Sequence, residues 1–193
     1  MIPILLNPRW SGAIVHTQTP TIQSAYATVR VPTVTSAHRA GKEIADWVGV
    51  GGWHRPLNLC QAGISLGYSS TGQPQIGLIA QDYPSPPVGG VSVAPGNMIQ
   101  IRVGHWGGHF AAEATDETTG RSLMVGCRVP YRGWHHAEWI VEKPAGTFLA
   151  TTPVIFFHDG LTRSDRGPLH WARDTSMPWW PVIKRGSITV TIQ

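Results

Sequence analysis

The chain is poor in charged residues and has no long hydrophobic run. Asp, Glu, Lys and Arg make up only 13% of its 193 residues, and the net charge of +4 at pH 7 comes from scattered Lys and Arg. A nucleic-acid site normally needs a concentrated basic patch or a recognisable module, and the sequence has neither. No segment approaches the roughly 18 apolar residues of a membrane span. We therefore expect neither nucleic acid nor a membrane as a partner.

Cysteine is also scarce, because Cys60 and Cys127 are the only two. Two thiols allow one disulfide or none, and their spacing does not decide between these states. Cys60 alternates with apolar residues along the chain, which favours a buried and inert thiol.

The start of the chain lacks a targeting signal. Residues 1–8 contain an apolar run that is too short for a signal peptide, and they have no basic start. We therefore expect a soluble protein that is not obviously exported. The sequence does not identify its compartment.

Glycine, proline and tryptophan are abundant instead. The chain has 22 Gly and 16 Pro, about a fifth of its length, together with nine Trp and 41% apolar residues. Apolar and polar residues alternate with period two in most segments, and no long stretch has a helical period. The sequence thus predicts an all-β fold, an antiparallel two-sheet β-sandwich. It predicts one domain over residues 1–193, with residues 1–9 as an N-terminal extension.

The predicted strands are separated by turn-forming residues such as Gly51-Gly52 and Pro95-Gly96-Asn97. They cover residues 10–15, 24–32, 44–50, 57–66, 75–83, 99–103, 110–116, 122–129, 137–142, 153–157 and 188–192. Two of them, on either side of the Thr118-Thr119-Gly120 turn, are expected to form a hairpin. Residues 158–181 are rich in Arg, Asp, Pro and Trp, and are expected to form a loop with one short helical turn.

The predicted strand at residues 137–142 carries two carboxylates on one face. Alternation places Glu138 and Glu142 opposite the apolar side chains of Trp139 and Val141. Such a face is often only the half-solvated side of an antiparallel sheet. In a cleft, however, a carboxylate can activate water as a general base and later protonate a leaving amine.

Gln61 is a second candidate, on the outward face of its predicted strand and among small residues. A surface glutamine is the ordinary interpretation. Paired with Glu142, its amide could donate a hydrogen bond to the oxyanion of a tetrahedral intermediate. This pairing requires no covalent nucleophile, which suits a chain without a convincing Ser-His-Asp or Cys-His arrangement.

Several short motifs occur in the same order as in a known family. They are Trp-Ser-Gly-Ala at residues 10–13, Trp-Val-Gly-Val-Gly-Gly at 47–52, Leu-Cys-Gln-Ala-Gly at 59–63, Pro-Gly-Asn at 95–97, Thr-Thr-Gly at 118–120 and Ala-Glu-Trp-Ile-Val-Glu at 137–142. The last strand, at residues 185–191, is also similar. In these motifs the sequence resembles the glutamic peptidases (eqolisins, the peptidase A4/G1 family).

The resemblance implies a concanavalin-like β-sandwich with a bent sheet that lines a substrate cleft. It also implies a catalytic dyad of Gln61 and Glu142, which match the Gln and the second Glu of the family's motifs. The implied substrate is a polypeptide, and no metal or other cofactor is implied. Trp10 and Trp47 match family residues that line the cleft, so they are candidate substrate contacts. Ordinary aromatic packing is the alternative for both.

The chain departs from the family's pattern at two positions. Gly51 replaces an Asp, and Gln81 stands where the family places a cleft glutamate. Losing two carboxylates would alter the pKa of Glu142 and the hydrogen bonding of the cleft. We retain Gln81 and Glu138 as candidate substrate-binding residues. Glu138 could raise the pKa of Glu142 by like-charge repulsion, or it could make a structural hydrogen bond farther along the strand.

Two hypotheses for the function follow. The first is an acid-acting glutamic endopeptidase. The second is a non-catalytic β-sandwich module that binds peptide or glycan, or that has protein partners in a larger assembly such as a phage particle. Fungal members of the family are secreted acidic zymogens, whereas this chain is basic, which indicates a bacterial-type or phage-borne member or a relative with another role.

Loop positions, rather than a metal site, are expected for His105, His109, His135 and His136.

Overall fold

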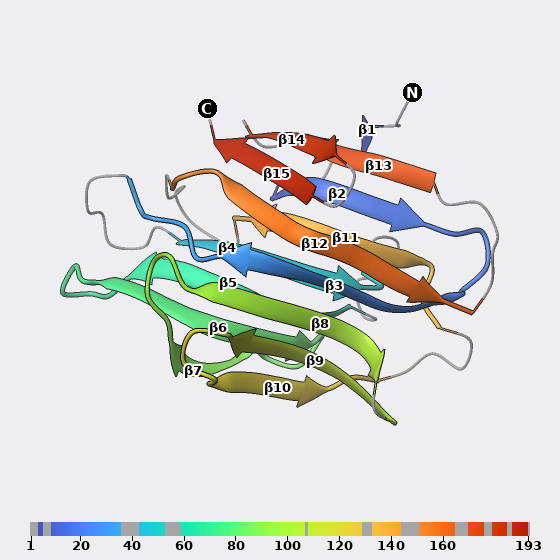
Figure 1. The fold of residues 1–193 in the computed structure, drawn as a ribbon, viewed down its shortest axis with the longest axis horizontal. Helices are drawn as coiled ribbons and strands as arrows, with labels where there is room; N and C mark the ends of the chain where they lie inside the picture. The colour runs from blue at the N-terminus through green and yellow to red at the C-terminus, as the bar shows by residue number, and fades with distance from the viewer. Residues whose placement is uncertain are drawn as a thin grey trace.

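Two β-sheets packed face to face form the molecule (Figure 1). The computed structural model describes residues 4–5, 9–35, 43–52, 59–106, 108–128, 133–143, 151–164, 170–175, 179–184 and 187–192. Within these ranges no helix is long and apolar enough to cross a membrane.

Sheet A has eight strands, and it carries most of the residues singled out in the sequence. In spatial order its strands are β1 (Ile4–Leu5), β13 (His170–Thr175), β2 (Trp10–His16), β11 (His136–Glu142), β4 (Glu43–Val50), β5 (Cys60–Tyr68), β6 (Pro74–Asp82) and β7 (Val88–Ser92). Neighbouring strands are antiparallel except for β1 and β13, which are parallel.

Sheet B has seven strands and covers one face of sheet A. In spatial order its strands are β10 (Ser122–Gly126), β9 (His109–Asp116), β8 (Met98–Trp106), β3 (Ile22–Arg30), β12 (Val154–Arg163), β15 (Ser187–Ile192) and β14 (Trp179–Lys184). All neighbouring pairs are antiparallel, including the predicted hairpin of β9 and β10. The all-β, two-sheet prediction is therefore confirmed.

The space between the sheets is filled by the alternating apolar residues of the sequence. Ala27 and Val29 of β3 belong to one buried cluster with Ile64 of β5 and Trp139 of β11. The indole N–H of Trp139 donates to the backbone carbonyl of Tyr26 at 3.1 Å, so it links β11 to β3 across the interface. Each polar face of these strands is consequently directed away from the core.

One acidic side chain breaks the apolar pattern of this core. Asp46 of β4 lies on the same strand face as Ile44 and Val48, which belong to the cluster between the sheets. Its side chain is fully buried, and neither carboxylate oxygen has a hydrogen-bond partner in the part of the chain that the structure describes. Burial raises the pKa of Asp46 well above its ordinary value, which favours the uncharged acid.

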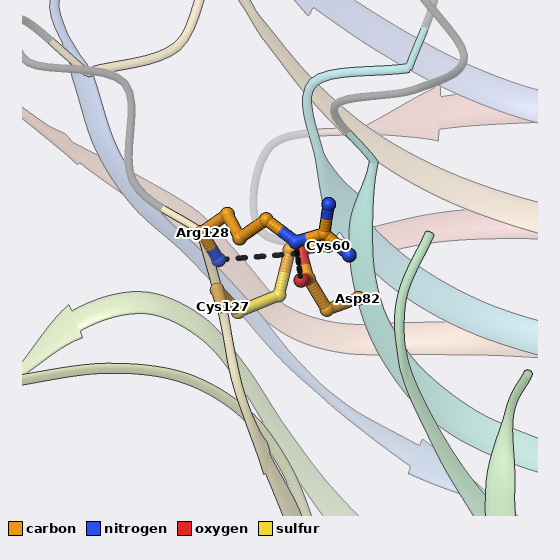
Figure 2. Close-up of a disulfide and its surroundings, with 4 residues drawn as sticks. All are labelled: Cys60, Asp82, Cys127 and Arg128. Carbon is orange, nitrogen blue, oxygen red and sulfur yellow. Dashed lines mark hydrogen bonds and ion pairs between the residues drawn. A yellow bond between two sulfur atoms is a disulfide. The ribbon is translucent and has the colours of Figure 1, made fainter. Parts of the chain in front are cut away.

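The two cysteines form a disulfide, so the prediction of an inert free thiol at Cys60 is wrong (Figure 2). Their Cα atoms are 5.9 Å apart, and the bond joins the first residue of β5 to Cys127, just after β10. Next to it, the Arg128 guanidinium forms an ion pair with Asp82 of β6, with Nε and Oδ2 2.9 Å apart. We call these four residues the clamp, because they hold the segment after β10 against β5 and β6.

The region predicted as a loop between residues 158 and 181 is largely extended where the structure describes it. Strand β12 continues to Arg163, and β13 and β14 follow, so the loop prediction is wrong there. Strand β13 is supported by pairing with β2, and β14 contains Pro181 at the edge of sheet B, where a missing N–H is tolerated. Neighbouring strands, rather than local alternation, define these elements.

Candidate active site

A cavity of about 520 Å³ opens on the face of sheet A that points away from sheet B. Because side chains alternate along a strand, every second residue of each central strand lies on this face. Among the residues that line it are Trp10, Trp47, Gln61, Gln81 and Glu142. The cavity therefore collects residues from five strands that are far apart in the sequence.

Glu142 ends strand β11, between Trp10 of β2 and Ala45 of β4 in the sheet register. The indole Nε1 of Trp47 donates to its Oε2 at 2.8 Å. Burial raises the pKa of Glu142 above its ordinary value, while hydrogen bonds from Trp47 and Trp10 and the charge of Arg9 oppose this shift. The negative charge of Glu43 adds to the upward shift. The result is a carboxyl group that is protonated more readily than usual but still has donors for its ionised form.

The two tryptophans form an aromatic corner beside this carboxylate. Their rings meet edge to face, with centroids 5.0 Å apart and planes at 82°. Trp47 is fully buried, and its ring lies over Gly49, where a Cβ atom would come within 2.8 Å of the ring. The glycine of the Trp-Val-Gly motif thus makes room for the indole that contacts Glu142.

Gln61 faces Gln81 across the pair of strands β5 and β6. Its Nε2 donates to Oε1 of Gln81 at 2.6 Å, and Nε2 of Gln81 donates to the backbone carbonyl of Ser85 at 2.8 Å. Gln61 is only 8% exposed. Its amide is therefore held in a chain of hydrogen bonds at one end of the cavity.

Gln61 and Glu142 share the cavity but occupy different rows of the sheet. Gln61 is the cross-strand partner of Gly49, whereas Glu142 is the partner of Ala45. The two rows are separated by four residues of β4, which corresponds to about 13 Å at roughly 3.3 Å per residue. Each side chain also bonds to a different partner. Long side chains, a bound substrate and water have to span this offset for the two to act on one bond.

Glu138 shares the row of Gly49 and Gln61, and lies on the same face as Glu142. Its side chain is fully buried, and it does not belong to the described lining of the cavity. The structure therefore separates the two glutamates of the motif by exposure. Glu142 meets the cavity, whereas Glu138 lies beneath its surface.

Two charged residues of the cavity were missed in the sequence. Arg9 precedes Trp10, and Glu43 begins β4 and accepts a hydrogen bond from Ser65 at 2.8 Å. Alternation with Ala45 and Trp47 is the signal that would have placed Glu43 on this face. For Arg9 the sequence offers no comparable signal, because it lies outside the strand.

Gly51, the first departure from the family's pattern, follows β4 directly. Its φ of 84° lies in the left-handed region, which glycine adopts without strain. Its N–H donates to the carbonyl of His136 at 3.1 Å. A backbone turn thus occupies the place where the resemblance implies a carboxylate.

The loop prediction is wrong for three of the histidines considered as metal ligands, because His105 lies in β8, His109 in β9 and His136 in β11. His105 packs on Phe110, with ring centroids 4.5 Å apart, and Nδ1 of His135 lies 3.1 Å from the carbonyl oxygen of Thr17. In the described ranges no three His, Cys, Asp or Glu side chains are grouped to hold a metal ion.

Comparison with known proteins identifies solved structures with a similar fold. No curated protein sequence matches the chain significantly. Scytalido-glutamic peptidase, solved with a peptide-based transition state analogue, has a similar fold: TM-score 0.73 and 16% identity over 98% of this chain and 100% of that chain. SCP-B, a member of the eqolisin family solved with the tripeptide Ala-Ile-His, gives a TM-score of 0.69 at 16% identity and the same coverage.

A third structure, aspergilloglutamic peptidase from Aspergillus niger, gives a TM-score of 0.57 and 23% identity, with 79% of this chain and 99% of that chain covered. These similarities show the fold. The family assignment comes from the sequence profile of the Peptidase A4 family, which matches residues 8–161. The chain therefore belongs to the Peptidase A4 family, the glutamic peptidases.

Proposed function

We propose that this protein is an acid-acting endopeptidase in which Gln61 and Glu142 cleave a peptide bond with an activated water. Family and fold both support a peptidase. The observation that carries the dyad is a half-buried carboxylate with a raised pKa and a glutamine amide in the wall of one cavity.

In this mechanism the ionised carboxylate of Glu142 accepts a proton from water as the water attacks the scissile carbonyl. The amide N–H of Gln61 stabilises the oxyanion that forms. Glu142 then passes the proton to the leaving amine, so one group acts first as base and then as acid. The indole N–H groups of Trp47 and Trp10 favour the ionised form that starts the reaction.

A polypeptide is the substrate that suits this site. The cavity is bounded by the aromatic corner of Trp10 and Trp47 at the Glu142 end and by the glutamine pair at the other end. Two structures of the same fold were solved with peptide-like ligands, a transition state analogue and a tripeptide.

The test is cleavage of an unfolded protein between pH 2 and 7 by wild type, Glu142→Gln and Gln61→Ala. We expect each variant to lose at least about 100-fold in kcat, because general-base and oxyanion groups each contribute that much or more. Glu113→Gln, on β9 of sheet B and outside the cavity, is the matched control and should retain activity. Full activity in both cavity variants would overturn the dyad.

The second candidate is a peptide-binding module without catalysis. It is favoured by the presence of Gly51 and Gln81 at two positions where the resemblance to the family implies carboxylates. Saturable binding of an unfolded polypeptide, without cleavage at any pH in the same assay, would support this function over the first.

A further inference from the structure

The amide of Gln61 has a defined orientation that depends on two other residues. A backbone carbonyl can only accept a hydrogen bond, so the group of Gln81 that faces the Ser85 carbonyl must be its NH₂ group. The Oε1 of Gln81 then faces Gln61 and requires a donor, which is Nε2 of Gln61 at 2.6 Å. The network therefore fixes which end of each amide points where.

The reversed orientation of Gln61 is unfavourable. It would bring two amide oxygens together at hydrogen-bond distance, in a position that is only 8% exposed. In the observed orientation, Nε2 uses one N–H on Gln81 and keeps a second. That second N–H is the donor that an oxyanion needs.

The Ser85 end of this chain is itself held in place. Arg128 donates from Nη2 to Oγ of Ser85 at 3.3 Å and from Nε to Oδ2 of Asp82 at 2.9 Å (Figure 2 shows the contact with Asp82). Asp82 directly follows Gln81, so the clamp restrains both the residue that orients Gln81 and the strand that carries it.

We infer that Gln81 is a positioning residue, which holds the amide of Gln61 with an N–H directed into the cavity at every pH. The inference rests on the proposed peptidase function. An amide does not titrate, so this chain keeps its oxyanion donor oriented without depending on a proton. A carboxyl group at position 81 could copy the network only in its protonated form, because an ionised carboxylate still accepts from Gln61 but is repelled by the Ser85 carbonyl that fixes its position.

Gln81→Glu tests this directly. Below pH 4.3, the usual pKa of Glu, we expect the kcat of the variant to stay within about threefold of the wild-type value. Above that pH we expect the kcat of the variant to fall by about another tenfold relative to wild type, with KM little changed. Gln81→Leu removes both hydrogen bonds and should lose about tenfold at all pH values. A merely structural role for Gln81 would not produce a loss that protonation reverses.

Other charged or titratable groups surround position 81, and their effect on the pH profile has to be removed by comparing the variant with wild type. They are Arg9, Glu43, Tyr83 and Glu142 in the cavity, Glu138 in the same cross-strand row, and the Asp82–Arg128 pair beside it. All are present in wild type and variant, so the ratio of their kcat values at each pH isolates position 81.

Gln75→Glu is the matched control, because Gln75 is exposed at the start of the same strand and does not line this cavity. It should follow wild type over the whole pH range. The inference is overturned if Gln81→Glu also follows wild type at all pH values, or if Gln81→Leu is fully active. If wild type itself cleaves no polypeptide, the peptidase proposal fails and this inference fails with it.

Discussion

Asp46 and Glu142 lie on adjacent strands of sheet A but on its opposite faces. Burial raises the pKa of both. Glu142 has indole donors, an arginine nearby and access to a cavity, so its ionised form is stabilised in part. Asp46 lies among apolar side chains, and neither of its oxygens has a described partner. The comparison shows that partners, and not burial alone, distinguish a carboxyl group whose ionised form is stabilised from one held in its neutral form.

The largest expected effect concerns the clamp. Replacing Cys60 and Cys127 together by Ala removes a cross-link between residues 67 positions apart. Loop-closure entropy predicts a loss of about 4 kcal/mol in the free energy of unfolding, which urea denaturation would measure. An unchanged free energy of unfolding would show that the bond does not restrain the unfolded chain.

Replacing Asp46 by Asn should flatten the pH dependence of stability. The folded-state pKa of Asp46 is raised, so the folded protein binds this proton more tightly than the unfolded chain does. Its contribution is complete below the unfolded pKa of about 3.9 and is lost as pH rises, by about 1.4 kcal/mol for each pH unit until the folded pKa is reached. Denaturation curves from pH 3 to 7 should therefore show Asp46→Asn more stable than wild type at neutral pH only.

Asp116 provides a control, because its pKa is shifted in the direction opposite to that of Asp46. Burial tends to raise its pKa, but hydrogen bonds from Thr119, Asn97 and the backbone of residues 118 and 119 lower it overall. Its contribution is present at neutral pH and is lost as pH falls. Asp116→Asn should accordingly destabilise at pH 7 and lose this effect in acid. Parallel pH profiles for the two Asn variants would contradict the distinction between the two sites.

The smallest expected effect distinguishes the contributions of the two indole N–H groups, of Trp47 and of Trp10, to the pKa of Glu142. Trp47→Phe keeps an aromatic ring but removes the 2.8 Å hydrogen bond, so the pKa of Glu142 should rise further. The acid limb of the profile of kcat/KM against pH should move to higher pH, with about a tenfold loss on its acid side. Trp10→Phe should move the limb in the same direction by less. A shift to lower pH in either variant would contradict this account.

Strands with regular alternation could be predicted from the sequence, whereas those defined by their neighbours could not. Residues 22–30 and 43–50 show their apolar face directly, and both form strands. The segment Val88–Ser92 has two glycines and little apolar pattern, and it is a strand because it pairs with β6. Pairing with a neighbouring strand is not visible in the residue pattern of the segment itself.

The residues of the cavity show the same limit. Motif order pointed to Gln61, Glu142 and both tryptophans, and all of them line the cavity. The carbonyl that orients Gln81 belongs to Ser85, four residues farther along. Every residue has a backbone carbonyl, so the residue type at position 85 could not predict this contact. Asp46 could have been placed in the core from its alternation with Ile44 and Val48, because the period of two applies to polar residues as well.

The clamp also has a consequence for engineering this protein. Cys60 and Asp82 are the chain neighbours of Gln61 and Gln81, and both are tied to the segment at residues 127–128. Neighbours in a strand project to opposite faces, so each cleft amide is carried on backbone that is anchored from behind. Libraries that randomise only substrate-lining positions would leave this anchoring untouched. Arg128 does not line the cavity, so substitutions there would alter this anchoring without changing a lining residue.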